Sequence, residues 1–199
     1  MEFNHVSVLL NECIENLNIK PDGVYVDCTM GGAGHSKEIV KRLSAKGRLF
    51  CFDQDINAIN VAKDRLKEYN DRVVLIHSNF ENLKAELESR GIYGIDGVLA
   101  DLGVSSHQLD EAGRGFSYMH DARLDMRMDD RASMSAWQVV NEYSQEDLYT
   151  IIKDYGEEKW AKRIAEFIVE ERANHTIDTT FDLVDVIKKA IPKGARIDG

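Results

Sequence analysis

The first hundred residues of the chain alternate between short apolar runs and longer amphipathic segments. Continuous apolar runs of this length are typical of parallel strands that are buried on both faces. The segments between them repeat apolar residues at helical spacing, as at Ile39, Val40 and Leu43. This alternation predicts an α/β fold with a parallel, doubly wound sheet and right-handed crossovers. The predicted strands lie at residues 24–27, 48–52, 73–77 and 95–101.

From about residue 110 onward the pattern is helical, and no run after Asp101 has the character of a strand. We therefore expect a Rossmann-like domain over residues 1–109 and a helical lobe for substrate recognition over residues 110–199. The sequence predicts only four strands, and the strands that would complete the sheet are absent from this chain. We therefore expect the fourth strand to have an unpaired edge. Such an edge predicts association of chains, with a homodimer as one form, or poor solubility.

A glycine-rich turn, Gly31–Gly34, follows the first predicted strand and precedes a helix. Strand, glycine turn and helix in this order place a small-molecule site at the carboxyl end of the first strand, because glycines let a ligand approach bare backbone. The dinucleotide fingerprint fails here, since its third glycine, counted from Gly32, falls at Lys37. Asp27 at the strand end would also repel a pyrophosphate. S-adenosylmethionine, which has no phosphate, suits the turn better.

A second acid, Asp53, follows the second predicted strand. It lies about 20 residues after the turn, where a carboxylate binds ribose hydroxyls in Rossmann-like sites. Nicotinamide enzymes share this acid, so an oxidoreductase stays open as an alternative, as does a structural turn without a ligand. Phe80, after the third strand, is placed either to contact an adenine or to cap the next helix.

The fourth predicted strand ends at Asp101. Methyltransferases that act on amino groups keep the residues that meet the acceptor at this position. A carboxylate there can hydrogen-bond the N–H of a weakly nucleophilic ring amine and take its proton. The alternative is that Asp101 holds the ammonium of the cofactor. The sequence leaves both roles open.

The net charge of −10 argues against a protein that is basic all over and binds nucleic acid in that way. A local basic patch remains compatible with it. Arg123, Arg127 and Arg131 lie close together with interleaved aspartates. Two interpretations are open: a solvated loop with internal ion pairs, or a loop that carries arginines toward a phosphate backbone.

The remaining composition predicts a soluble, cytoplasmic protein without a metal. Three cysteines form no C-x-x-C pair, which is typical of reduced thiols in the cytosol. The histidines show no metal-ligand spacing. We find neither a signal peptide nor a long apolar span and expect no membrane partner.

Several motifs are spread over residues 5 to about 165: HVSVLL, DCTMGGAGHS, FDQD, DLGVSS with QLD, RGFSY, LDMRMD and YGEEKWAKRIA. Taken together, they closely resemble the ribosomal RNA small subunit methyltransferase H family, also called the MraW family. One departure concerns Ala122-Arg123, where the family has Gly-Pro. A second is that the family continues past residue 199 with a basic segment and further strands.

The resemblance implies a class I methyltransferase fold with an inserted helical lobe. It also implies methyl transfer from S-adenosylmethionine to N4 of a cytosine in the decoding region of 16S rRNA, with the small ribosomal subunit as partner. Asp101 is then the candidate catalytic residue. A noncatalytic RNA-binding module with the same fold is a further alternative. The implied cofactor contacts are Ala33, Gly34, His35, Asp53, Phe80, Asp101 and Gln108.

Overall fold

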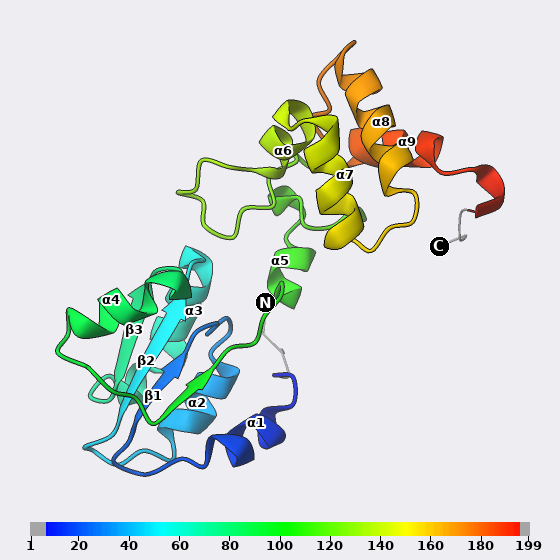
Figure 1. Cartoon of the computed structure of the whole chain (residues 1–199). Helices are drawn as coiled ribbons and strands as arrows, with labels where there is room; N and C mark the ends of the chain where they lie inside the picture. Colours follow the sequence, from blue (N-terminus) through cyan, green and yellow to red (C-terminus); the bar gives the residue numbers. More distant parts are fainter. Residues whose placement is uncertain (1–6, 196–199) are drawn as a thin grey trace. The chain divides into compact units, whose positions relative to one another are not determined.

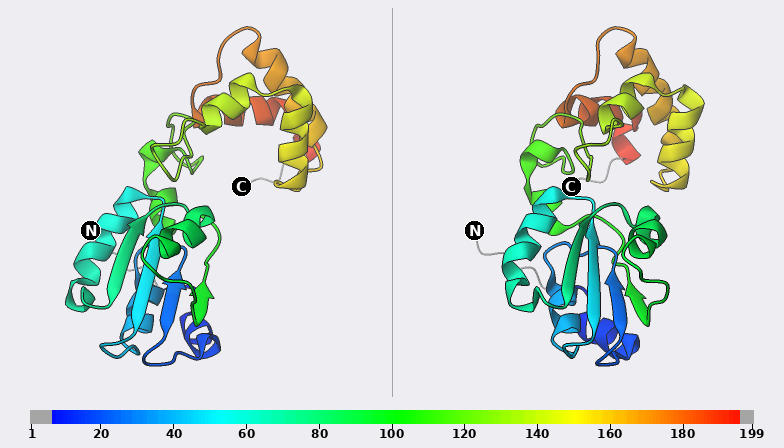
Figure 2. Two further views of the ribbon diagram at one scale, coloured as in Figure 1. Left: turned by 60° about the vertical axis from the view of Figure 1, so that its left-hand side comes forward. Right: turned by 90° about the vertical axis from the view of Figure 1, so that its left-hand side faces the viewer.

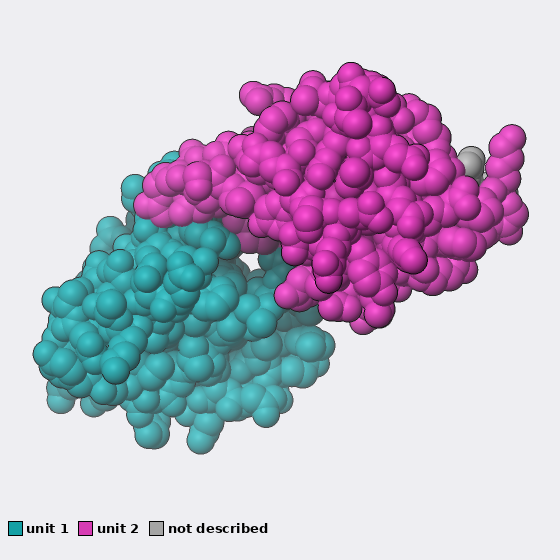
Figure 3. All heavy atoms as spheres, turned by 45° about the horizontal axis from the view of Figure 1, so that its top comes forward, with its two compact units in different colours: residues 1–103 teal, residues 104–199 magenta. Residues whose placement is uncertain are grey.

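The computed structural model describes residues 7–195 (Figure 1). His5, which opens the HVSVLL motif, lies outside the described residues. The chain divides into two compact units, Met1–Gly103 and Val104–Gly199 (Figure 3). The sequence places the domain boundary at residues 109–110, a few residues later. Each unit has its own hydrophobic core and is described separately below.

Unit 1 contains one sheet of four parallel strands in the order β3-β2-β1-β4 (Figure 2). The predicted parallel sheet and its alternation with helices are confirmed. The strands are β1 Val24–Asp27, β2 Arg48–Asp53, β3 Val73–His77 and β4 Gly97–Leu99. The helices are α1 Leu10–Leu17, α2 Gly34–Val40, α3 Ile56–Arg65 and α4 Leu83–Glu88, with short 3₁₀ turns η1 Lys67–Tyr69 and η2 Phe80–Asn82.

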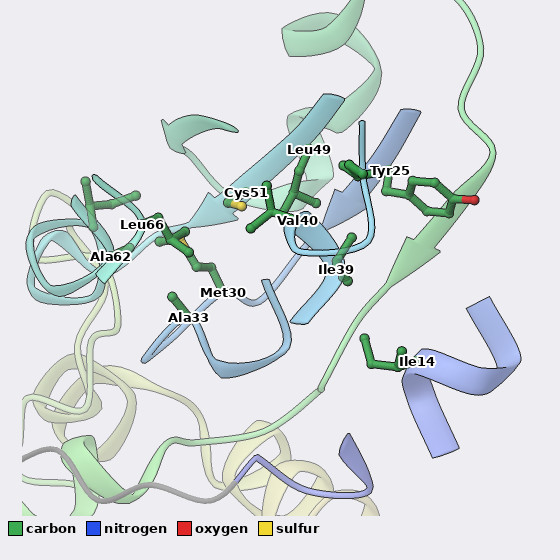
Figure 4. Packing of buried hydrophobic residues seen from close by; sticks show 12 residues of the cluster. Ile14, Tyr25, Met30, Ala33, Ile39, Val40, Leu49, Cys51, Ala62 and Leu66 are labelled. Atoms are coloured by element: carbon green, nitrogen blue, oxygen red, sulfur yellow. The ribbon is translucent and has the colours of Figure 1, made fainter. Parts of the chain in front are cut away.

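The strands are apolar on both sides because helices cover both faces of the sheet. Tyr25 and Leu49 belong to a cluster that also contains buried residues of α1, α2 and α3 (Figure 4). Their neighbours Val26 and Phe50 point to the opposite face and pack with Leu87 of α4. Adjacent residues of a strand face opposite sides, so a continuous apolar run serves both layers.

Among residues 7–195, β4 lies at an edge of the sheet and pairs with β1 alone. Within this range the outer side of β4 has no partner strand, in line with the sequence pattern. Val98 is 52% exposed, whereas its partner Val26 on β1 is 1% exposed. Only Gly97–Leu99 of the predicted 95–101 run forms a strand. Association through this edge stays a prediction.

Unit 2 is helical, and among its described residues the only β-type pairing is an isolated bridge between Arg123 and Thr179. Its core is formed mainly by α6, α7, α8 and α9. Helix α9 begins after its N-cap residue Thr179 and ends before Pro192. The helices are α5 Ser106–Asp110, α6 Ala136–Glu142, α7 Gln145–Asp154, α8 Ala161–Arg172 and α9 Thr180–Ala190, with 3₁₀ turns η3 Ala112–Arg114 and η4 Lys193–Ala195.

Candidate functional site

Because all four strands are parallel, their carboxyl ends lie together at one end of the sheet, called here the strand-end edge. Asp53 ends β2, while Phe80 and Asp101 follow β3 and β4. The backbone N–H of Asp101 donates to the Thr29 hydroxyl over 2.7 Å, which ties the segment after β4 to the segment after β1. The structure thus gathers these predicted site residues and the glycine turn at one sheet edge.

The glycine turn is held from two sides. Gly31 has a φ of +49°, a left-handed conformation that favours glycine. Its N–H donates to Asp53 Oδ2 over 2.8 Å. On the other side, Arg65 of α3 donates from Nη1 to the Gly32 carbonyl over 2.6 Å. Arg65 is not among the predicted site residues, because a contact across 33 positions leaves no local pattern in the sequence.

Asp53 is half-buried and accepts backbone hydrogen bonds from Gly31, from Asp55 and from Gln54. Burial raises the pKa of its carboxyl group, and the backbone donors oppose that shift. An ionised carboxylate has about four acceptor positions, so these backbone donors leave it capacity for a ligand hydroxyl group. A partly exposed carboxylate beside a tight glycine turn therefore fits a ribose with two neighbouring hydroxyls.

Asp27 does not face the sheet edge, although it ends β1. It is fully buried and accepts hydrogen bonds from the Ser36 hydroxyl, at 2.6 Å, and from the Thr29 N–H, at 3.2 Å. The Cys51 thiol in turn donates to Ser36 over 3.3 Å. Burial raises the pKa of Asp27, and the two donors oppose the shift. Asp27 therefore binds residues on both sides of the turn from inside the protein, and repulsion of an anionic ligand is not its main role.

The three predicted cofactor contacts in the turn are Ala33, Gly34 and His35, and they differ in the part of the residue that a ligand can reach. Ala33 precedes α2 in a left-handed conformation, with φ of +61°, and Gly34 is the first residue of the helix. The imidazole of His35 is buried, and its Nε2 donates to the carbonyl of Val8 over 3.0 Å. At His35 the backbone is the part that can face a ligand, because the imidazole is hydrogen-bonded to Val8.

Phe80 and Asp101 are the exposed members of the group. The Phe80 ring is 40% exposed at the start of η2. Asn79, just before it, donates to the Gln54 side chain over 3.2 Å and so links the segments after β2 and β3. An exposed ring on a fixed backbone can stack against a base. Asp101 is exposed and near the turn, as both of its predicted roles require.

Gln108 belongs to unit 2, where it has a structural role. Its side-chain oxygen accepts from the Ser105 N–H over 3.0 Å, and its own N–H donates to the Ser105 hydroxyl over 3.2 Å. This is a capping box at the start of α5. The Ser-x-x-Gln spacing is a sequence signal for that cap. A cofactor contact by Gln108 stays a prediction.

Two of the three predicted arginines, Arg127 and Arg131, bind groups within the 113–131 loop. Arg127 pairs with Asp125 at 2.7 Å, and Arg131 pairs with Asp129 at 2.7 Å. Arg114 donates to backbone carbonyls of the same loop. These ion pairs match the first interpretation of the loop. Contact with a phosphate backbone stays a prediction.

Ala122-Arg123, where the family has Gly-Pro, joins the loop to the start of α9. The Thr180 N–H donates to the Ala122 carbonyl over 2.8 Å, and the Ala122 N–H donates back to the Thr180 hydroxyl over 3.1 Å. Backbone bonds of this kind form without the family's Gly-Pro pair, so the departure is compatible with an ordered loop.

Among residues 7–195, no helix combines the length and the apolar character that crossing a bilayer requires. No group of three or more histidine, cysteine, aspartate or glutamate side chains in the same range is arranged to hold a metal ion. Cys13, Cys28 and Cys51 are all free thiols.

Comparisons with known proteins cover the whole chain. A model described as the MraW methylase family matches residues 2–199. The ribosomal RNA small subunit methyltransferase H of Clostridioides difficile is 75% identical over 199 residues, which are 100% of this chain and 64% of that protein. Its namesake in Finegoldia magna is 59% identical over 198 residues, 100% of this chain and 63% of that protein. The chain thus spans less than two thirds of these relatives.

Among solved structures, a SAM dependent methyltransferase from Aquifex aeolicus is 14% identical with a TM-score of 0.37. The match covers 74% of this chain and 79% of that chain.

Proposed function

Because this chain belongs to the MraW methylase family, we propose that it binds S-adenosylmethionine and methylates N4 of a cytosine in the decoding region of 16S rRNA. Its fold is the Rossmann-like fold of class I methyltransferases. The observation that carries the proposal is the half-buried Asp53 carboxylate, which holds the glycine turn and retains acceptor capacity. High identity to a named rRNA methyltransferase supports the choice of substrate class.

In this proposal each cofactor contact has a distinct part. Asp53 accepts the ribose hydroxyls, and Phe80 stacks on the adenine. Ala33, Gly34 and the His35 backbone line the methionine end. These assignments follow the chemistry of the side chains, since a carboxylate suits a diol and an exposed ring suits a base. Gln108 is included on the family resemblance alone.

The cofactor supplies a methyl group that its positively charged sulfur activates for transfer. A cytosine N4 amine is a poor nucleophile because its lone pair is delocalised into the ring. A carboxylate that accepts a hydrogen bond from the amine would localise that pair and receive the proton as the N–C bond forms. The bond between sulfur and the methyl group would break at the same time, and its electron pair would leave with sulfur as a neutral thioether. Asp101 is our candidate for this step, and its rival role is to hold the cofactor's ammonium.

The RNA must deliver a single base to the strand-end edge. A stacked cytosine is out of reach of a pocket, so the target base has to leave its stack. Unit 2, the helical lobe, is proposed to present the RNA of the small ribosomal subunit. Alignment of the amine with the methyl group then supplies much of the acceleration.

The first test is calorimetric titration of S-adenosylmethionine into the 199-residue chain. We expect binding, and a loss of about 1–3 kcal/mol for Asp53→Ala, the range for a lost hydrogen bond to a charged group. Asp64→Ala is the matched control, because Asp64 is an exposed acid on the neighbouring helix α3. Equal affinity in the Asp53 and Asp64 variants would remove Asp53 from the site. Titration with NAD tests the oxidoreductase alternative.

The second test is transfer of a labelled methyl group to small ribosomal subunits, followed by nuclease digestion and mass spectrometry of the nucleosides. N4-methylcytidine is the expected product, and the intact relative from Clostridioides difficile serves as positive control. Asp101→Asn separates the two roles of Asp101. A lower kcat with unchanged cofactor affinity indicates a proton acceptor, and weaker cofactor binding indicates an ammonium ligand. Binding without any transfer would favour the noncatalytic module.

A further inference from the structure

The amino-terminal segment Ser7-Val8 lies directly against the glycine turn. The His35 imidazole is 7% exposed, and its Nε2 is 3.0 Å from the carbonyl oxygen of Val8. A carbonyl only accepts, so Nε2 must carry the proton in this hydrogen bond. The one described hydrogen bond of the His35 side chain thus goes to a segment 27 positions earlier in the chain.

Gly34 provides a second contact with the same segment. A Cβ atom at Gly34 would lie 2.0 Å from the Ser7 hydroxyl oxygen and 3.3 Å from the Ser7 Cβ. Apart from its chain neighbours and its own helix, it would meet no other described residue within 4 Å. Gly34 does not have the left-handed φ that usually calls for glycine. The close approach of Ser7 is therefore the reason that this position needs glycine.

Helix α1, which follows Ser7-Val8 directly, holds this segment beside the glycine turn. Ile14 of α1 is buried in the cluster shown in Figure 4, together with residues of α2 and the sheet. Leu9, with φ of +49°, precedes the helix in a left-handed conformation. The chain therefore turns sharply where α1 begins, and Val8 lies at the start of a helix that is fixed to the unit.

From these two contacts we propose that His35 is a positioning residue, whose imidazole holds Ser7-Val8 against the turn, and that this segment is a wall of the cofactor site. The inference rests on the proposed function, because it assigns the turn to S-adenosylmethionine. A docked segment fixes the backbone of Gly34 and His35 before the ligand arrives. Preorganisation of this kind raises affinity because less conformational entropy is lost on binding.

The test compares His35→Gln with His35→Phe. Glutamine places an amide N–H near the position of Nε2, whereas phenylalanine keeps the ring and removes the donor. Hydrogen exchange of residues 8–13 reports segment docking, and calorimetry reports S-adenosylmethionine affinity. We expect His35→Phe to lose protection in that stretch and to bind about three- to tenfold more weakly, the effect of one hydrogen bond. His35→Gln should recover most of both.

Lys37→Ala on the exposed side of α2 is the matched control and should change neither readout. In the transfer assay, His35→Phe should raise the KM for S-adenosylmethionine and leave kcat nearly unchanged, because the segment acts on binding. A loss of kcat at saturating cofactor would instead give His35 a part in the chemistry and overturn the positioning role.

A double-mutant cycle tests the Ser7 contact independently. Gly34→Ala should weaken cofactor binding and deprotect residues 8–13, because the new methyl group displaces Ser7. Ser7→Gly removes both atoms that the methyl group would meet, so the double variant should bind more tightly than Gly34→Ala alone. Additive losses would mean that Ser7 does not contact the turn, and the proposal would fail.

The proposed function and the role of His35 are overturned by different results. An unmodified chain that shows protection in residues 8–13 but binds no S-adenosylmethionine would overturn the proposed function, and with it the segment's role as a wall of that site. An unmodified chain that binds the cofactor while His35→Phe keeps full protection and affinity would overturn the inference alone.

Discussion

The buried carboxyl group of Asp27 makes the stability of unit 1 depend on pH in a direction opposite to that of most acids. Burial raises the pKa of Asp27 above its value in the unfolded chain. Between the unfolded and the folded pKa the native state then holds more protons, so this group's contribution to stability falls as pH rises through that window. Each unit of upward shift costs about 1.4 kcal/mol once the pH exceeds the folded pKa.

Asp27→Asn removes the titration and keeps the shape. Its amide oxygen can accept from the Thr29 N–H, and its amide nitrogen can donate to the Ser36 hydroxyl. The stability of this variant relative to the unmodified chain should therefore increase from about pH 4 upward, starting at the usual aspartate pKa. Asp27→Ala has no such rescue. It leaves two donors without acceptors at about 1–3 kcal/mol each, so a loss of about 2–6 kcal/mol is expected.

Urea unfolding at several pH values between 4 and 8, followed by circular dichroism, measures these differences. Both tryptophans, Trp137 and Trp160, belong to unit 2, so their fluorescence serves as an internal control that should not follow the Asp27 substitution. A stability difference between Asp27→Asn and the unmodified chain that is constant over this pH range would refute the reasoning. A difference that turns against the asparagine as pH rises would show that the native site prefers the ionised carboxylate.

Three further predictions concern other parts of the chain. Arg65→Met removes the donor to the Gly32 carbonyl, so S-adenosylmethionine affinity should fall about three- to tenfold by calorimetry, and unchanged affinity would mean that the turn holds its shape without Arg65. Thr179→Ala removes the cap of α9 and should cost about 0.5–2 kcal/mol in unfolding followed by tryptophan fluorescence; a full-size effect on unit 1 would contradict this assignment. Burial raises the pKa of the Cys28 thiol to about 11, so Ellman's reagent at pH 8 should modify the half-buried Cys13 first, and equal rates for the two would count against the buried position.

The sequence predicts the sheet well because its strands are buried on both faces and so are continuously apolar. Element ends are less predictable, since they depend on tertiary contacts. Leu43 continues the helical spacing of Ile39 and Val40, yet α2 ends at Val40 and Leu43 is buried in the turn that follows. β4 is shorter than its apolar run because only Gly97–Leu99 pair with β1, which itself ends at Asp27.

The candidate site was predictable where its residues follow strand ends, since parallel order alone brings Asp53 and Asp101 to one edge. The roles of neighbouring groups were not predictable in this way. Asp27 also ends a strand, but its partner Ser36 lies on the next helix, and only the folded chain shows that the pair is buried. Arg65 carries no motif at all, because it acts through a backbone carbonyl that every residue possesses.

One carboxylate, that of Asp53, accepts the N–H of Gly31 in the turn and the N–H of Asp55 just before α3. Under the proposed function the same group binds the ribose, so the two halves of the ligand are thermodynamically linked through it. Adenosine that engages Asp53 would order the turn for the methionine end, and methionine would favour adenosine by the same factor, because linkage between binding sites is reciprocal. The two fragments, offered separately, should therefore bind cooperatively, although neither touches the other's main contacts.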